Sequence, residues 1–153
     1  MNAFLKTMAM LLLVSGFVAC SSDDEFKPQP LDVTPNNISG IWTLSEVNGE
    51  KLPDNLFFYI EFVRRDRKFT SYLNLDSMYP RRITGTFSIE EDKYKGALLS
   101  GKYDFGAGAW NKTYIVSGLY EDYMLLTADD DSGEVCKYVR CNEVPSEILD
   151  MFE

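Results

Sequence analysis

The sequence predicts an all-β domain, an eight-stranded up-and-down antiparallel barrel with a short C-terminal helix. Aromatic residues are abundant, with 10 Phe, 9 Tyr and 2 Trp, and aromatic side chains favour strands. After Ser39, eight short apolar runs alternate with turn residues, and no long segment of helical period interrupts them. Eight sequential strands joined by short connections can close into a barrel that leaves no edge exposed.

Residues 1–19 have the three parts of a secretory signal peptide. Lys6 supplies a positive charge, residues 8–18 form an apolar run, and the small Ala19 precedes Cys20. The run is shorter than the roughly 20 residues that a membrane-spanning helix needs. The Ala19-Cys20 junction resembles the lipobox of bacterial lipoproteins, in which the Cys becomes a lipidated N-terminus. The alternative is an ordinary secretory signal followed by a chance Cys.

Residues 20–37 are expected to form the lipidated Cys20 and a flexible linker, since they are rich in Pro, Asp, Ser and Asn. The run Ser-Ser-Asp-Asp-Glu at residues 21–25 resembles the acidic export signal of Bacteroidetes surface lipoproteins. The alternative is that it is only a solvated part of the linker. The resemblance implies an outer-membrane lipoprotein, exposed at the cell surface and attached to the membrane through its lipid anchor.

The barrel domain is predicted over residues 38–153. Alternation is clearest in "ITGTFSI", where Ile83 and Phe87 share one face with Ile89 while Thr and Ser residues occupy the other. The closing "PSEILDMFE" is the single helical phrase, with an apolar stripe to lie against the barrel wall. The predicted strands are Gly40–Val47, Phe57–Arg64, Lys68–Leu75, Arg82–Ile89, Tyr94–Ser100, Lys112–Leu119, Tyr123–Ala128 and Glu134–Cys141.

The amino-acid composition excludes several classes of function. The formal net charge of −9 opposes binding to nucleic acid through bulk charge. His is absent, which removes Ser-His-Asp and Cys-His nucleophile pairs together with His-based metal sites. Carboxylate or Lys chemistry is left open, but no nucleophile with its base can be named. The sequence therefore predicts a protein that is not an enzyme, with no catalytic residue and no cofactor.

Cys136 and Cys141 lie five residues apart on one predicted strand. A strand rise of about 3.3 Å per residue separates them by roughly 16 Å, whereas a disulfide needs Cα atoms within about 7 Å. Two free thiols are expected.

Loop lengths predict which end of the barrel is open. Successive connections of an up-and-down barrel alternate between its two ends, and the longer ones are the first, third, fifth and seventh. Binding residues concentrate on loops held by a rigid scaffold. We therefore expect Tyr79 in the third connection and Tyr103, Phe105 and Trp110 in the loop 101–111 to bind ligand. The alternative is that these aromatics fold inward and fill a small barrel.

Two short polar motifs have less specific interpretations. Asp129, Asp130 and Asp131 invite a calcium interpretation, but their spacing does not match a twelve-residue calcium loop, and Asp-Ser-Gly is ordinary hairpin chemistry. No metal site is predicted. The tripeptide centred on Ser77 resembles a Bacteroidetes O-glycosylation site.

The phrase "SGIWTLSEVNGEKL" resembles the opening strand of lipocalin-like domains found in Bacteroidetes lipoproteins, and its Gly40-x-Trp42 is similar to the Gly-x-Trp of lipocalin barrels. The resemblance covers roughly residues 38–141. It implies that Trp42 plugs the closed end of the barrel and that Arg140, from a late strand, packs across it.

The leading hypothesis is a non-enzymatic binding module for a small apolar or amphipathic ligand. The alternative is a recognition or accessory lipoprotein that presents the aromatic loop 101–111 to a glycan or to an outer-membrane protein partner.

Overall fold

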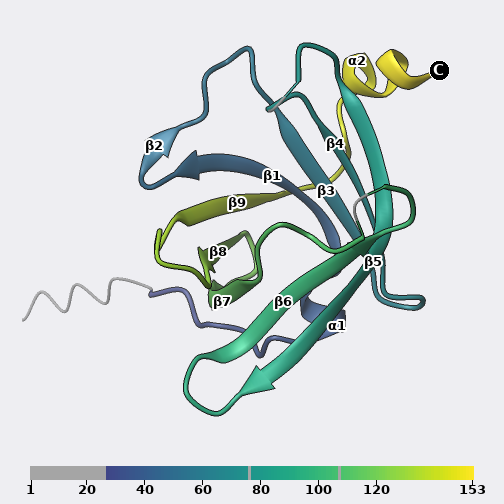
Figure 1. Ribbon diagram of the computed structural model, residues 1–153. Coiled ribbons are helices and arrows are strands. Elements are labelled where there is room, and N and C mark those ends of the chain that lie inside the picture. Colours follow the sequence, from purple (N-terminus) through teal and green to yellow (C-terminus); the bar gives the residue numbers. More distant parts are fainter. Residues whose placement is uncertain (1–26, 76, 107) are drawn as a thin grey trace, which may run out of the picture.

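A computed structural model describes residues 27–75, 77–106 and 108–153 (Figure 1). The predicted signal peptide, the lipidation site Cys20 and the acidic run 21–25 lie outside the described residues, as does Asp76 of the predicted glycosylation tripeptide. In chain order the elements are α1 (Pro35–Ile38), β1 (Gly40–Val47), β2 (Glu50–Lys51), β3 (Phe58–Val63), β4 (Lys68–Leu73), β5 (Arg81–Asp92), β6 (Gly96–Tyr103), β7 (Tyr114–Leu119), β8 (Tyr123–Ala128), β9 (Val135–Cys141), α2 (Ser146–Leu149) and the 3-10 helix η1 (Asp150–Phe152).

The strands β1 and β3 to β9 form a closed antiparallel barrel (Figure 1). Each strand pairs with the next along the chain, and β9 returns to pair with β1 from Ile41–Cys141 to Val47–Cys136. The seam between β6 and β7 is short, with ladder pairs only at Leu98–Ile115 and Leu99–Tyr114. The predicted eight-stranded up-and-down barrel is confirmed, and its topology is lipocalin-like, as the resemblance implied.

Most strand boundaries differ from the prediction by one to three residues, and one short strand was missed. Strand β6 runs on to Tyr103, into the predicted loop 101–111. The two-residue strand β2 was not predicted; it pairs with the end of β1 across a tight turn at Asn48 and Gly49. Strand β5 continues to Asp92, where the sequence predicted a turn, because residues 90–92 still pair with β6. The carboxylate of Asp92 accepts hydrogen bonds from the backbone N–H groups of Tyr94 and Lys95 at 2.8 and 2.9 Å. This Asx-type turn closes the hairpin three residues later than expected.

The alternation predicted along the strands is confirmed on the inner face. In β3, Ile60 and Phe62 are buried while the residues between them are not. In β4, Phe69, Ser71 and Leu73 point inward in the same way. One continuous apolar cluster occupies the barrel interior and includes residues from each barrel strand. The period of two therefore places the side chains that the barrel encloses.

The chain before the barrel packs against it from Leu31 onward, within the range 20–37 predicted as a linker. The backbone N–H of Leu31 donates to the carbonyl of Leu119 at 2.7 Å, and Leu31 and Val33 contact the core. Thr34 then caps α1, its hydroxyl accepting from the N–H of Asn37 at 3.2 Å. The reason is apolar burial, because this short segment ends in the fully buried Ile38.

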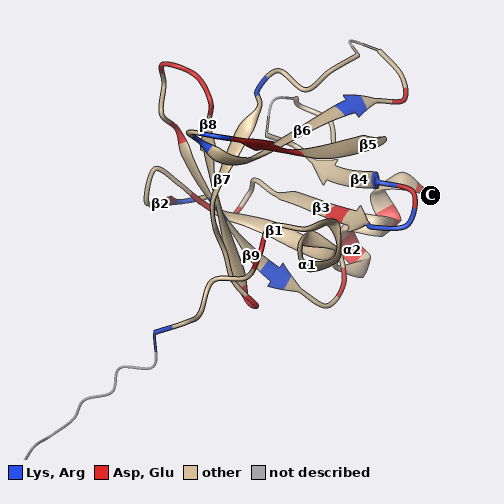
Figure 2. Ribbon diagram, turned by 90° about the horizontal axis from the view of Figure 1, so that it is seen from below, with Lys and Arg blue, Asp and Glu red and all other residues tan. Residues whose placement is uncertain are grey.

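The C-terminal helix lies against the outer wall of the barrel, as predicted. Val144 and Ile148 are buried, and the Phe152 ring lies 5.5 Å from the ring of Tyr72 on the outer face of β4. Leu149, which was expected in the same apolar stripe, is exposed. Figure 2 shows segments of Lys and Arg interspersed with segments of Asp and Glu over the strands and loops.

Candidate functional site

Trp42 closes one end of the barrel. Its side chain is 0% exposed, and its indole N–H donates to the carbonyl of Ile38 at 2.8 Å. The guanidinium carbon of Arg140 lies 4.0 Å from the centroid of the Trp42 ring, within cation–π range. The structure thus places Arg140 across Trp42, where the resemblance put it.

The Arg140 guanidinium connects β9 to two other segments at this closed end, the residues before β1 and the turn after β7. It donates to the backbone carbonyls of Glu121, Ser39 and Asn37 at 2.6, 2.7 and 2.8 Å. Gly40 makes room for it, because a Cβ there would lie 2.7 Å from the Arg140 Nη1 atom, and the backbone φ of +119° suits glycine. Since the donors and carbonyls are matched, this end contributes stability rather than a binding site.

The longer connections lie at the opposite end, as the loop lengths predicted. They are residues 48–57, 74–80, 104–113 and 129–134, while the short turns 64–67, 93–95 and 120–122 lie at the Trp42 end. This opposite end is called the open end below.

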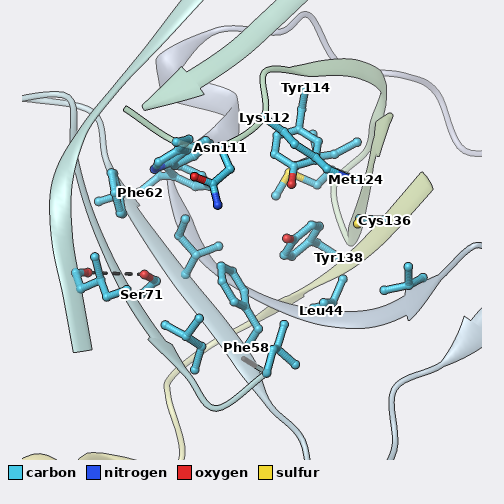
Figure 3. A pocket seen from close by; sticks show the side chains of 18 of the residues that line it. Leu44, Phe58, Phe62, Ser71, Asn111, Lys112, Tyr114, Met124, Cys136 and Tyr138 are labelled. Carbon is cyan, nitrogen blue, oxygen red and sulfur yellow. Dashed lines mark hydrogen bonds between the residues drawn. The ribbon is translucent and has the colours of Figure 1, made fainter. Parts of the chain in front are cut away.

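The barrel interior contains a cavity of about 370 Å³ toward the open end. Ligand pockets commonly have volumes of roughly 300–1,000 Å³, so this cavity suits a small molecule. Figure 3 shows side chains from several strands converging on it. Its lining consists of Leu44, Val47, Phe58, Ile60, Phe62, Phe69, Ser71, Leu73, Leu75, Ile83, Tyr103, Trp110, Asn111, Lys112, Tyr114, Met124, Leu126, Glu134, Cys136 and Tyr138.

Most of the cavity wall is apolar. The buried Ser71 is an exception on the β4 side, and its hydroxyl donates to the carbonyl of Ile83 at 3.4 Å (Figure 3). Aromatic rings hold one another in place, with Phe62 and Phe87 in edge contact at 5.0 Å and Phe58 and Tyr138 at 5.9 Å. An apolar body can therefore be enclosed without burying an unpaired charge.

Polar groups gather on the β7–β9 side of the cavity. Figure 3 shows Tyr114, Tyr138 and Cys136 there, with Lys112 near the rim. The ammonium group of Lys112 lies 3.1 Å from a carboxylate oxygen of Glu134 and 3.7 Å from one of Asp130. The hydrogen bond to Glu134 raises the pKa of Lys112. This cation is thus neutralised within the protein before any ligand arrives.

Burial raises the pKa of three other groups that line the cavity, Tyr114, Tyr138 and Cys136. It raises the pKa of Tyr114 to about 12 and the pKa of the Cys136 thiol to about 11. Burial likewise holds the pKa of Tyr138 well above its ordinary range. Near neutral pH the two phenols are hydrogen-bond donors, and the thiol is a weak nucleophile because it is protonated.

The four predicted ligand-binding residues divide into two pairs. Tyr103 and Trp110 line the cavity. Tyr79 and Phe105 do not, and their side chains are 74% and 88% exposed. The alternative that the aromatics fold inward therefore describes Tyr103 and Trp110 alone, and ligand binding by all four stays a prediction.

Trp110 folds inward because a space is kept for it. Its ring lies edge-on to Phe69 at 5.1 Å and to Tyr114 at 6.4 Å, and its backbone N–H donates to the carbonyl of Gly101 at 2.8 Å. A Cβ on Gly101 would overlap the indole ring. The position of Trp110 thus depends on a glycine in the neighbouring strand.

Sequence reasoning did not single out Tyr114, Tyr138, Lys112 or Glu134 as site residues. A signal was present for one of them, since alternation along β9 places Tyr138 on the inner face together with Cys136. Tyr is common in strands, so its position alone did not distinguish a cavity hydroxyl from a core ring. The predicted free thiols are found: Cys136 is buried, Cys141 is partly exposed, and both are free on β9.

The acidic run after β8 serves as a turn. Asp130 accepts hydrogen bonds from the hydroxyl and the backbone N–H of Ser132, and Asp129 pairs with the Lys95 ammonium at 2.6 Å. Across residues 27–75, 77–106 and 108–153, no three His, Cys, Asp or Glu side chains are grouped closely enough to hold a metal ion. Within the same ranges, every helix is too short or too polar to span a bilayer.

Comparison with known proteins gives fold likeness at low identity. No protein-family model matches the chain, and no curated protein matches it. A lipocalin-like protein from Bacteroides uniformis aligns with a TM-score of 0.48 and 16% identity, covering 69% of this chain and 99% of that one. Japanin from Rhipicephalus appendiculatus, solved with bound cholesterol, aligns with a TM-score of 0.42 and 17% identity, covering 78% of this chain and 88% of that one. At these values neither likeness identifies a ligand for this chain.

Proposed function

We propose that this protein is a non-enzymatic binding module that holds a small, largely apolar molecule inside its barrel. The observation that carries the proposal is the cavity of about 370 Å³, lined mainly by aliphatic and aromatic side chains and located beneath the longer loops. An engineered apolar cavity of roughly 150 Å³ suffices for benzene. The volume here therefore suits a ligand between benzene and a drug-sized molecule.

The neutral probe N-phenyl-1-naphthylamine tests this proposal, using the chain without residues 1–19 and with Cys20 replaced by Ser. We expect its fluorescence to rise with saturation at one probe per protein. Ser71→Phe places a ring in the cavity and should weaken binding by at least about 10-fold, because an occupied interior cannot accept the probe. Thr70→Phe, on the outer face of the same strand, is the matched control and should change binding by less than about 2-fold.

Absence of saturable binding would contradict the proposal. Equal effects of the two variants would also contradict it, because the probe would then sit outside the barrel.

A glycan or an outer-membrane protein as the partner of the loop 101–111 is the second proposal. Its support is Phe105, which lies in a loop at the open end and is exposed there, as is Tyr79 in another loop of that end. Phe105→Ala should abolish such binding without changing the affinity for the naphthylamine probe. The inward-facing Trp110 is less suited to this role than the sequence indicated, since its ring contacts Phe69 inside the barrel.

Attachment to the outer membrane through a lipid on Cys20, with exposure at the cell surface, is part of the same proposal. It rests on the sequence of residues 1–25. Incorporation of labelled fatty acid by the full chain, and its loss in Cys20→Ser, is the expected result. Protease treatment of intact cells then tests exposure, and protection of the protein would contradict it.

A further inference from the structure

The phenol hydroxyls of Tyr138 and Tyr114 are two of the polar groups that line the cavity. Tyr138 is only 8% exposed, and its ring is held by edge contact with Phe58 at 5.9 Å. Figure 3 shows the hydroxyl groups of Tyr138 and Tyr114 on the cavity side of their rings. Both tyrosines line the same cavity, Tyr114 from β7 and Tyr138 from β9.

Within the described part of the chain, neither hydroxyl has a hydrogen-bond partner. Every side-chain nitrogen and oxygen atom there that is fully shielded from solvent is bonded, so these two oxygens reach the open volume of the cavity. A hydroxyl that faces a cavity can hydrogen-bond to water or to a polar atom of a ligand, and most such groups in native proteins have one of these partners. The pair therefore indicates where a polar atom of a ligand would lie.

The charges around the cavity indicate whether the polar atom of the ligand is charged or neutral. Among the lining residues, Lys112 and Glu134 are the ionic side chains, and they pair with each other at 3.1 Å. Asp130 adds a second carboxylate 3.7 Å from the same ammonium group. An anion entering the cavity would meet a cation already paired with two carboxylates, and it would lose its hydration on the way.

We propose that the ligand is a compact, uncharged molecule whose carbonyl or hydroxyl oxygen accepts hydrogen bonds from Tyr138 and Tyr114, while its apolar remainder fills the β3–β5 side of the cavity. This inference rests on the proposed function, since it names the ligand class of the same cavity. The phenols select for a ligand with an oxygen acceptor, because a ligand without one would bury the phenol hydroxyls without a hydrogen-bond partner, which is unfavourable. The acidic residues Glu134 and Asp130, which already pair with Lys112, disfavour carboxylate ligands such as free fatty acids.

A pair of probes separates this inference from the proposed function. The ketone 6-propionyl-2-(dimethylamino)naphthalene carries a carbonyl whose emission shifts to the red when it accepts a hydrogen bond. Its parent, 2-(dimethylamino)naphthalene, lacks that oxygen. Tyr138→Phe combined with Tyr114→Phe removes both hydroxyls and keeps the ring shapes, and Tyr123→Phe changes a phenol on the outer face of β8 as the control.

We expect the double variant to bind the ketone about 3- to 10-fold more weakly, as one net hydrogen bond requires, and to shift its emission to the blue. Binding of the parent naphthalene should change by less than about 2-fold, and Tyr123→Phe should leave both probes unchanged. Thermal unfolding of each variant confirms that it folds. In competition for the ketone site, decanol should displace the probe at lower concentration than decanoate.

The other outcomes have distinct meanings. If both naphthalenes bind but the double variant weakens them equally or not at all, the hydrogen-bonding inference is overturned and the proposed function stands. If decanoate displaces better than decanol, the preference for uncharged ligands is overturned. If neither naphthalene binds the unmodified protein, the proposed function and this inference both fail.

Discussion

The two ends of the barrel each contain one of the two tryptophans, and they use it differently. At the closed end, Trp42 lies under the Arg140 guanidinium, and the polar donors of both side chains reach backbone carbonyls. At the open end, Trp110 covers a cavity in which the hydroxyls of Tyr114 and Tyr138 face open volume. Matched donors stabilise a fold, whereas donors left available can bind something else.

This difference indicates that stability and binding are separated along the barrel axis. The closed end connects β1, β9, the residues before β1 and the turn after β7 through one guanidinium. The open end has most of its polar groups on β7, on β9 and in the loops that precede them, around a volume that the apolar core does not fill. Substitutions at the two ends should therefore affect different measurements.

The largest expected effect comes from the closed end. Trp42→Ala removes a fully buried indole and should lower the free energy of unfolding by about 3–5 kcal/mol. Trp110→Ala removes a partly exposed ring beside an existing cavity and should cost about 1–2 kcal/mol. Urea denaturation followed by circular dichroism measures both. Equal losses would show that the two ends contribute alike and would contradict the comparison.

A matched pair of glycine substitutions should give the next largest effect. Gly40→Ala introduces a Cβ 2.7 Å from Arg140 Nη1 at a backbone φ of +119°, and we expect a loss of about 1–3 kcal/mol in stability. Its effect on the affinity for the naphthylamine probe should be negligible. Gly101→Ala instead displaces the Trp110 ring from its place, so it should change probe affinity severalfold.

The two readouts for this pair are thermal unfolding and probe titration on the same preparations. An affinity change in Gly40→Ala that matches the change in Gly101→Ala would mean that the closed end communicates with the cavity.

The smallest effect is expected at alkaline pH and should arise at the open end. Burial raises the pKa of Cys136 from 9.0 to about 11 and the pKa of Tyr114 from 10.0 to about 12. A raised folded-state pKa means that the stability contribution is fully present below the unfolded pKa and is lost as pH rises through the folded value. The melting temperature should therefore fall from about pH 9 to about pH 12.

Tyr114→Phe and Cys136→Ala should each flatten that decline, because each removes one of the groups that titrate. The comparison with the unmodified protein is made by thermal unfolding at one-unit pH steps. An unchanged slope in both variants would assign the alkaline loss to groups outside the cavity.

Much of the fold could be predicted because strand periodicity is local. In β3, Ile60 and Phe62 are buried while Glu61 between them is not, and this alternation is visible in the sequence itself. The segment before the barrel was harder to place. Leu31 and Val33 are two apolar residues among polar ones, and only the presence of β7 and the core beside them explains why they pack.

The candidate site was predicted only in part, as two aromatics of one loop illustrate. Trp110 and Phe105 lie five residues apart in one loop, with two glycines between them, and both were expected to bind ligand. One packs against Phe69 inside the barrel and the other is 88% exposed. The residue types do not distinguish them, because the space that receives Trp110 is provided by Gly101, and only the structure places that glycine in β6 beside the indole ring.

The sequence by itself determined the number and order of the strands, their inward faces and the end that holds the longer loops. These follow from alternation and turn chemistry, which act over a few residues. Only the tertiary structure decided that a cavity remains, which aromatics enter it, and that Tyr114 and Tyr138 share it with a neutralised Lys112. The physical reason is that an enclosed volume depends on the side chains of eight strands packing at once.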